Sequence, residues 1–447
     1  MTRDYTSGNI WKALIFLAVP MILEMMMEAL FALVDIYYLS KVSEDAVAAV
    51  GITESVVTLI YALGIGIASG ATAMVARRIG EKNPKEASVA ASQAIIVTVI
   101  FSFIIAVPGF IFGEQILILM GGEPEMVAEG LWYTKIMMAT NVVIMLLFVL
   151  NGIFRGAGDA KIAMYSLALS SVINIVLDPI FIFGFGPIPE MGVKGAAVAT
   201  SIGRGIGVAF QLYILFNSKS QIKITRATFK WIPEVMGRLI KIASGGTMQY
   251  VIGSASWIVM VRIIADFGTE AVAAYTYAVR IIIFTILPAW GLANAASTLV
   301  GQNLGAEKPD RAEKSVWMTC ALNVGFLLIV SVVFFIFAEE FIGFFDSTPT
   351  IVAEGTKGLK IFSIGYVAYA FGMVISSAFN GAGDTFTPTL MNFICFWIIQ
   401  IPLAYYLVYN FEFQTTGVYI AIVLAEVIMG TLAIILFKRG TWKKTKV

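Results

Sequence analysis

Long apolar runs, each separated from the next by a short cluster of charged residues, glycine or proline, extend along the whole chain. A helix that crosses the apolar core of a bilayer needs roughly 20 such residues, whereas the strands of a membrane barrel alternate over about ten. The runs are long and do not alternate, so they predict membrane-spanning helices. We expect twelve spans, at residues 12–39, 46–73, 88–113, 127–154, 160–184, 192–216, 237–265, 271–299, 312–338, 353–379, 385–409 and 415–437.

One sequence pattern occurs twice, and the second copy follows the first at a constant lag. The motif Gly-Ala-Gly-Asp at 156–159 recurs at 381–384, and Ala-Val-Ala-Ala at 46–49 recurs at 271–274, so the lag is 225 in both cases. Repeats at a fixed period indicate a duplicated structural unit. Each copy holds six predicted spans, an even number, so we expect both copies to have the same orientation and to be related by a pseudo-two-fold axis along the membrane normal.

The predicted fold is therefore an all-α integral membrane protein, with twelve transmembrane helices in two six-helix bundles. The predicted domains are an N-terminal six-helix lobe at 1–216, a polar and basic cytoplasmic linker at 217–233, and a C-terminal six-helix lobe at 234–447. Two lobes that rock about a linker could open alternately to the two sides of a membrane.

Composition agrees with a lipid environment, since 59% of the residues are hydrophobic and 13% are charged. The net charge of +1, with no basic domain, gives no indication of a nucleic-acid partner. The chain has no histidine, which excludes Ser-His-Asp triads and zinc sites with His ligands. Cys320 and Cys395 lie in separate apolar runs, and we expect small core residues rather than a disulfide.

The basic residues predict the orientation, because Lys and Arg in short loops are retained on the cytoplasmic side. With twelve spans, most of the 30 Lys and Arg residues, Arg3 and Lys219 among them, fall on the side of the termini. The loops of the opposite side hold four: Lys41, Lys194, Lys357 and Lys360. We therefore expect both termini in the cytoplasm and a multi-pass protein of the cell (inner) membrane. The N-terminus does not have the pattern of a cleaved signal peptide, so the first span is expected to stay in the protein.

The first span carries three acids. Glu24 and Glu28 are four residues apart and Asp35 follows seven later, a spacing that places all three on one face of a helix. Because charge inside lipid is costly, at roughly 2.5–3.5 kcal/mol for a central residue, this face is expected to point into the protein.

The fifth predicted span offers the strongest single candidate, Asp178. Asn174 lies one helical turn before it, and Pro179 disfavours helix at Asp178 and frees a carbonyl one turn earlier. A carboxylate, an amide and loose carbonyls make an oxygen-rich site suited to Na⁺ or to a shuttled proton. Asp35 is expected at a similar depth, and two carboxylates that share a site have split titrations.

The internal repeat provides a control for this interpretation. At the lag of 225, Asp35 corresponds to Met260 and Asp178 to Leu403, so the second copy is apolar at both positions. That difference argues against a scaffold role common to both copies. The alternative is that each carboxylate is paired with a structural partner such as Arg204.

Features of energy-supplying and enzymatic proteins are missing from the sequence. There is no G-x-x-x-x-G-K-[ST] phosphate loop, so an ion gradient is the expected energy source. We expect no cofactor apart from the coupling ion, H⁺ or Na⁺, and no enzymatic activity, because the loops hold no cluster of Cys or acids with catalytic spacing.

An ordered set of these motifs resembles the multidrug and toxic compound extrusion (MATE) family over nearly the whole chain. The set comprises twelve spans in two bundles, Pro20 and Asp35 in the first span, the loop at 77–87 with its repeat at 302–312, Asn151 ahead of Arg-Gly-Ala-Gly-Asp at 155–159, and Asn174 with Asp178.

The resemblance implies an antiporter that exports organic, often cationic, compounds in exchange for H⁺ or Na⁺. It implies that the coupling ion is bound by side chains of the first lobe: Asp35, Asn151, Asn174, Asp178 and Thr200. The match is better to the DinF-like branch than to the NorM-like branch, which carries acids in spans 7 and 10. Here Gln249 stands where Glu24 stands in the first copy, and residues 361–379 hold no acid.

Further expectations follow for the transport path. Pro20 is expected to kink the first span and to serve as a hinge, while Glu24, Glu28 and Met27 are candidates for the substrate path. Na⁺, if it is the coupling ion, would bind at Asp35, Asn174 and Asp178. The expected partners are small organic substrates and the lipid bilayer, and the protein is expected to act as a monomer. The rival function is a flippase for lipid-linked precursors, which commonly has a strongly cationic central cavity.

Overall fold

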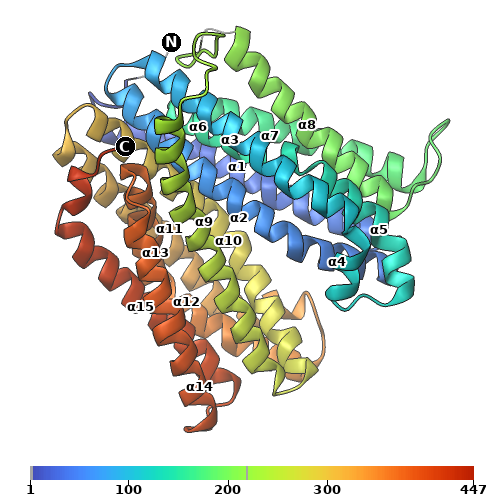
Figure 1. Cartoon of the computed structure of the whole chain (residues 1–447). Helices are drawn as coiled ribbons and strands as arrows, with labels where there is room; N and C mark the ends of the chain where they lie inside the picture. The colour runs from blue at the N-terminus through green and yellow to red at the C-terminus, as the bar shows by residue number, and fades with distance from the viewer. Residues whose placement is uncertain (1–3, 218–219) are drawn as a thin grey trace. The chain divides into compact units, whose positions relative to one another are not determined.

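The computed structural model describes residues 4–217 and 220–447, and its elements are helices (Figure 1). The basic residues Arg3 and Lys219, and positions 218–219 of the predicted linker, lie outside the described residues. The helices of the first half are α1 (Ile10–Leu39), α2 (Glu44–Gly80), α3 (Pro84–Ile111), α4 (Gly113–Leu119), α5 (Pro124–Ala139), α6 (Asn141–Gly156), α7 (Ala160–Phe183) and α8 (Val193–Asn217). Those of the second half are α9 (Pro233–Ala265), α10 (Thr269–Gly305), α11 (Pro309–Gly343), α12 (Pro349–Ala382), α13 (Phe386–Asn392), the π-helix η1 (Phe393–Gln400), α14 (Ile401–Tyr409), α15 (Thr415–Lys438) and the 3₁₀-helix η2 (Thr441–Lys444).

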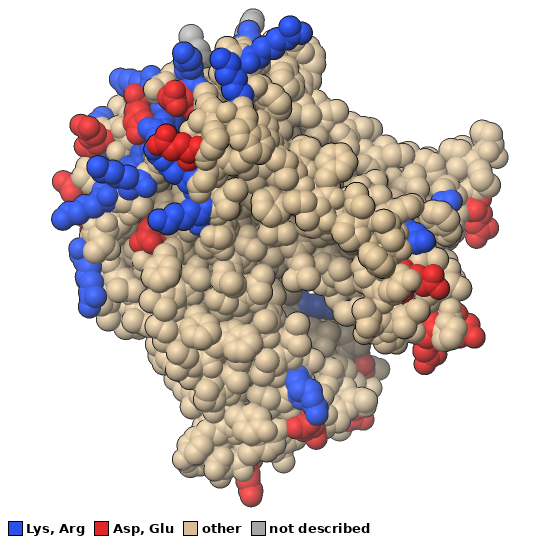
Figure 2. Space-filling view, viewed as in Figure 1, with Lys and Arg blue, Asp and Glu red and all other residues tan. Residues whose placement is uncertain are grey.

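Eleven helices among the described residues are long and apolar enough to cross a membrane, and the pair α5 and α6 makes a twelfth span if it is counted as one. The predicted all-helical membrane fold is thereby confirmed. Figure 2 agrees with it, because uncharged surface covers most of the visible face.

The span predicted at 127–154 corresponds to the pair α5 and α6, and it is bent rather than straight. The chain bends by 45° between α5 and α6, at Thr140. The Thr140 hydroxyl donates to the carbonyl of Ile136 at 2.7 Å, and the Asn141 amide donates to the carbonyl of Met138 at 2.7 Å. Short polar side chains that bind nearby backbone groups compete with the helical hydrogen bonds, which accounts for a break that apolar periodicity does not predict.

The span at 385–409 is also less regular than expected, since it contains the eight-residue π-helix η1 between α13 and α14. The N–H of Ile401 donates to the carbonyl of Phe396, five residues earlier. Pro402 follows directly, has no N–H to donate, and its ring crowds the carbonyl four residues before it. The proline therefore favours the wider hydrogen-bond spacing that precedes it.

The chain divides into two compact units, and the boundaries between them fall within α1 and α9. Unit 1 comprises Met1–Asp4 and Leu23–Thr247, and unit 2 comprises Tyr5–Ile22 and Met248–Val447. The boundaries after positions 22 and 247 are at equivalent places in the two copies of the sequence repeat. The first part of α1 thus packs with unit 2, and the first part of α9 packs with unit 1.

Two glycines at equivalent positions of the repeat allow these helices to pack closely. In unit 1, a Cβ atom at Gly66 would lie 2.5 Å from the carbonyl oxygen of Ala243 in α9. In unit 2, a Cβ atom at Gly291 would lie 2.7 Å from the Cα atom of Ile22 in α1. Since only glycine leaves room for such backbone contact, both crossings depend on residues that the duplication has kept.

The helix ends repeat as well. Lys82 and Glu307, at equivalent positions of the two copies, have φ of +57° and +58°, and Gly158 and Gly383 in the two Gly-Ala-Gly-Asp turns have φ of +85° and +88°. These left-handed residues end helices in the way expected of a C-terminal cap. The two Gly-Ala-Gly-Asp turns therefore lie at the ends of α6 and α12.

Residues 6–8 and the residues that follow α15, all within unit 2, lie near the start of α11. The Lys308 ammonium donates to the carbonyl of Thr6 at 2.8 Å, and the Arg311 guanidinium donates to the carbonyls of Ser7 and Gly8, each at 2.8 Å. At the other end, the buried Trp442 ring stacks on Phe437 with 4.7 Å between centroids.

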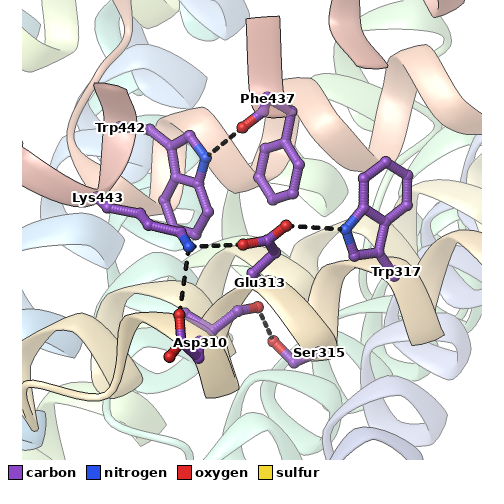
Figure 3. Close-up of polar contacts among 8 residues, drawn as sticks. Asp310, Glu313, Ser315, Trp317, Phe437, Trp442 and Lys443 are labelled. Atoms are coloured by element: carbon purple, nitrogen blue, oxygen red, sulfur yellow. Dashed lines mark hydrogen bonds and ion pairs between the residues drawn. The ribbon is translucent and has the colours of Figure 1, made fainter. Parts of the chain in front are cut away.

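Figure 3 shows the polar contacts of Trp442 and Lys443, which follow α15. Lys443 Nζ lies 2.6 Å from a carboxylate oxygen of Glu313 and 3.4 Å from Asp310, and Trp442 Nε1 donates to the carbonyl of Phe437 at 3.0 Å. Glu313 holds this ammonium in its charged form and raises the pKa of Lys443. The last residues of the chain are therefore part of the folded structure of unit 2. Cys320 and Cys395, also in unit 2, are buried and free, as expected of core residues.

Candidate functional site

The acids of α1 that lie in unit 1 are engaged in different ways. Glu24 is 1% exposed and forms an ion pair with Arg155 of α6, with 3.1 Å between Oε1 and Nη1. Glu28, one turn later, forms an ion pair of 3.0 Å with Arg204 of α8. Both carboxylates point into the helix bundle, as the spacing of the acids predicts. Glu24 and Glu28 are candidates for the substrate path, and the negative charge of each is already neutralised by an arginine.

Arg204 is the centre of a polar contact within the bundle. It is 3% exposed, and its guanidinium carbon lies 4.8 Å from the centroid of the Phe31 ring, a cation–π contact. Glu54 of α2 lies within electrostatic range of Arg204 and accepts a hydrogen bond of 3.3 Å from the Tyr133 hydroxyl. Arg204 thus forms a hydrogen bond with Glu28 of α1 and attracts the carboxylate of Glu54 of α2 electrostatically.

A separate cluster forms where α7 and α8 lie side by side (Figure 1). Asn174 Nδ2 donates to Asp178 Oδ1 at 3.1 Å and to Thr200 Oγ1 at 3.3 Å. Gly203, one turn after Thr200, makes this approach possible, because a Cβ there would lie 2.8 Å from the carbonyl oxygen of Ser170. The structure therefore brings three of the predicted residues together: Asp178, Asn174 and Thr200.

Asp35 stands beside this cluster without a hydrogen bond or ion pair to any described residue. It lies within electrostatic range of Asp178, Glu54 and Arg204. Asp178 is fully buried, and it too makes no ion pair within the described chain. The alternative in which Arg204 pairs with one of these two carboxylates is not what the structure contains, since that guanidinium is bound to Glu28.

Unused acceptor atoms gather at this place. Asp35 Oδ1, Asn174 Oδ1 and Asp178 Oδ2 are buried oxygens that accept no hydrogen bond within residues 4–217 and 220–447. Buried acceptors are costly unless they are satisfied, and a proton or a cation such as Na⁺ would satisfy them. The described residues contain no group of three or more His, Cys, Asp or Glu that could hold a metal ion, so a cation here would rely on amide and hydroxyl oxygens besides carboxylates.

Asn151 belongs to a different set of contacts. Its Oδ1 accepts a hydrogen bond of 2.6 Å from Gln211 Nε2, and its side chain lies by Glu24, the partner of Arg155. The structure groups it with these residues rather than with Asp178. The sequence did not lead us to predict Gln211 as a partner of Asn151. The available indication was a polar residue in an apolar span, seven residues after Arg204.

The remaining predicted positions lie elsewhere on α1. Pro20 is buried in the part of α1 that belongs to unit 2, and α1 is recorded as one helix through it, so its role as a hinge stays a prediction. Met27 is half-buried between Glu24 and Glu28 in unit 1.

Comparisons with known proteins agree with this fold. The family description MatE matches residues 20–180 and 247–406, once in each half of the chain. Probable multidrug resistance protein NorM of Thermotoga maritima is 27% identical over 440 residues, which cover 98% of this chain and 94% of that protein. Probable multidrug resistance protein YoeA of Bacillus subtilis is 25% identical over 453 residues, which cover 100% and 97%.

A solved structure is similar over the same length. The outward-facing conformation of a multidrug resistance MATE family transporter of the MOP superfamily superimposes with a TM-score of 0.92 at 27% identity and covers 98% of each chain. The family match and the similar transporters, together with the apolar helices, identify a multi-pass membrane transporter rather than an enzyme. The chain belongs to the MatE family.

Proposed function

We propose that this transporter is a multidrug efflux antiporter, which exports organic, often cationic, compounds in exchange for H⁺ or Na⁺. The coupling proposal rests on two carboxylates of unit 1, Asp35 and Asp178, that have no ion-pair partner among the described residues. Beside them lie buried oxygens that accept no hydrogen bond from the described chain. The similar proteins NorM and YoeA are described as probable multidrug resistance proteins, and this supports the choice of substrate.

The coupling ion would act by neutralising charge. In the state open to the outside, Asp35 and Asp178 would take up H⁺ or Na⁺, and Asn174 and Thr200 would supply neutral oxygens to the same ion. Two negative charges close together in a poorly solvated site repel each other, so neutralising them changes the packing that α1 and α7 prefer. A bend of α1 at Pro20 could then release the substrate, which would pass along the face with Met27. Asn151 would act from the neighbouring contact with Glu24.

The direction of transport and the location are part of the same proposal. Both termini lie in the cytoplasm, the protein resides in the cell (inner) membrane, and it works as a monomer. The acids of the first lobe, together with Gln249 in the second, support assignment to the DinF-like branch.

The flippase alternative is not favoured. A cationic cavity would need arginines whose charge is available, but Arg155 and Arg204 are bound to Glu24 and Glu28 at 3.1 and 3.0 Å.

Inside-out membrane vesicles test the function. An imposed H⁺ or Na⁺ gradient should drive uptake of a fluorescent lipophilic cation, and the effective gradient identifies the coupling ion. A protonophore should abolish uptake if the ion is H⁺, and a Na⁺ ionophore should abolish it if the ion is Na⁺. Uptake that is equal with and without both gradients would contradict coupled export.

A further inference from the structure

Unit 2 contains a carboxylate, Glu426, that takes no part in the proposed ion coupling. It is the twelfth of the 24 residues of α15, so it lies at the middle of a span. An ionisable side chain at the centre of a bilayer is expensive, and such groups commonly mark a functional site. Transporter substrates also tend to bind near this depth.

Glu426 is half-buried, and its neighbours on α15 show that it lies on the side of the helix that faces unit 2. Ile422, Met429 and Ala433, which share its face of α15, are buried. Leu424 and Val427, on other faces, are 42% and 41% exposed. A carboxylate between buried neighbours at spacings of three, four and seven residues lies on the inner face of the helix.

Helix α12 lies against this face. A Cβ atom at Gly430, one turn after Glu426, would lie 2.5 Å from the carbonyl oxygen of Ala368, so the two backbones are in close contact. Tyr369, the next residue of α12, and Cys395 of η1 both lie within electrostatic range of the Glu426 carboxylate. The carboxylate thus lies on the side of α15 against which α12 packs.

Glu426 forms no ion pair and no hydrogen bond with any residue that the structure describes. The repeat argues against a scaffold role of this acid common to both copies, because the equivalent residue of the first half is Ser201, whose hydroxyl lies 2.8 Å from that of Thr140. The acid is therefore particular to the second half, as Asp35 and Asp178 are particular to the first.

Two neighbouring features suit an organic cation. Tyr369 is half-buried, whereas Tyr366 and Phe362, one and two turns before it, are buried against other rings of unit 2, and an aromatic face attracts cations. The π-helix η1, which packs against α15, has a wider backbone hydrogen-bond spacing, and π-helical segments occur often at functional sites. A carboxylate and aromatic rings in an apolar setting are the elements that bind a bulky ammonium or phosphonium ion.

The geometry points to Glu426 and Tyr369 as a subsite of unit 2 that binds the charged group of an organic cation. The Glu426 carboxylate neutralises the positive charge, and the Tyr369 ring packs against the apolar groups that surround it. The inference rests on the proposed export function for its class of substrate, but it concerns binding and not coupling.

Equilibrium binding to the purified full chain tests this subsite without any gradient. Two probes of the same shape and opposite charge are used, tetraphenylphosphonium and tetraphenylborate. In Glu426→Gln, the dissociation constant for tetraphenylphosphonium should rise at least tenfold, while tetraphenylborate binds no more weakly than to wild type. Glu340→Gln, the same change at an exposed position of α11, should alter neither. Tyr369→Phe should bind the cation like wild type, and Tyr369→Leu should bind it about fivefold more weakly.

A folding defect in Glu426→Gln could also weaken binding of the cation. A second measurement therefore uses the wild-type chain. A carbodiimide that labels carboxyl groups in apolar surroundings should modify Glu426, and saturating tetraphenylphosphonium should protect it, as read by mass spectrometry. Unchanged cation affinity in Glu426→Gln, absence of protection, or a wild-type chain that does not bind the cation would each overturn the inference. A chain that binds the cation through Glu426 but fails gradient-driven uptake would contradict only the proposed coupling.

Discussion

Arg204 and Glu28 form an ion pair of 3.0 Å between α8 and α1. Because the guanidinium is engaged in this pair, it does not form an ion pair with the neighbouring acids. The guanidinium lies within electrostatic range of Asp35, yet its hydrogen bond goes to Glu28. Asp35 and Asp178 therefore remain as carboxylates without an ion-pair partner among the described residues. A cation from solution can fill that role, which links the packing of α8 on α1 to the proposed exchange.

Breaking the ion pair should destabilise the protein. Arg204→Met leaves the Glu28 carboxylate without its partner, and loss of one member of a buried pair typically costs about 3 kcal/mol. The double variant Arg204→Met/Glu28→Gln removes both charges and should recover more than half of the loss. Thermal unfolding in detergent, followed by tryptophan fluorescence, measures both. The single variant Glu28→Gln completes the cycle: if its loss and the loss in Arg204→Met simply add in the double variant, the two residues are not coupled.

The glycine crossing in unit 2 should not tolerate a side chain. A methyl group at Gly291 would lie 2.7 Å from the backbone of Ile22, so Gly291→Ala must push α10 and α1 apart, at a cost of about 1–3 kcal/mol. The control is Gly253→Ala in α9, where no atom lies within 4 Å of the new methyl group. It should be neutral or stabilising by up to about 1 kcal/mol. Equal unfolding temperatures for the two variants would show that the crossing is not tightly packed.

Stability should depend on pH through Asp159, which precedes α7 outside the membrane span. Burial raises the pKa of the Asp159 carboxyl, although the Ser220 hydroxyl donates to it at 3.3 Å and opposes the shift. The folded protein then binds more protons than the unfolded chain between about pH 4, the ordinary aspartate pKa, and the raised value. The contribution to stability is full below that window and is lost as the pH rises through it.

The variant Asp159→Asn removes this titration. It should be more stable than wild type at pH 7, and its unfolding temperature should change less between pH 4 and pH 7. The equivalent residue of the repeat, Asp384, provides the control, because it accepts hydrogen bonds from the N–H and the hydroxyl of Thr387 at 3.1 and 2.7 Å. Asp384→Asn should instead lose about 1 kcal/mol at pH 7. Parallel pH curves for wild type and Asp159→Asn would contradict the assignment.

Much of the fold could be predicted because the membrane imposes long apolar helices and the duplication imposes symmetry. The constant lag of the repeat relates not only the motifs but also the crossings at Gly66 and Gly291. The bend at Thr140 escaped prediction, since it results from side chains that bind the backbone in an otherwise apolar run. Hydrophobic periodicity does not detect such local competition.

The candidate site could be predicted only in part. The pairing of Asn174 with Asp178 is local, four residues apart on one helix, and so can be inferred from sequence. Which residue of another helix joins them depends on the helix register, which Gly203 determines by letting α8 approach α7. That register brings Thr200 to Asn174, and Asn151 makes its contacts with Gln211 instead.

The most direct test of the central claim separates ion coupling from substrate binding. Inside-out vesicles with wild type, Asp35→Asn or Asp178→Asn are assayed for gradient-driven uptake and for binding of the same lipophilic cation, with Asp266→Asn, an exposed acid after α9, as the control. Both site variants should lose at least nine-tenths of the driven uptake and keep their affinity for the cation within about threefold, while the control behaves like wild type. Driven uptake at the wild-type rate in Asp178→Asn would contradict the claim that this carboxylate carries the coupling ion.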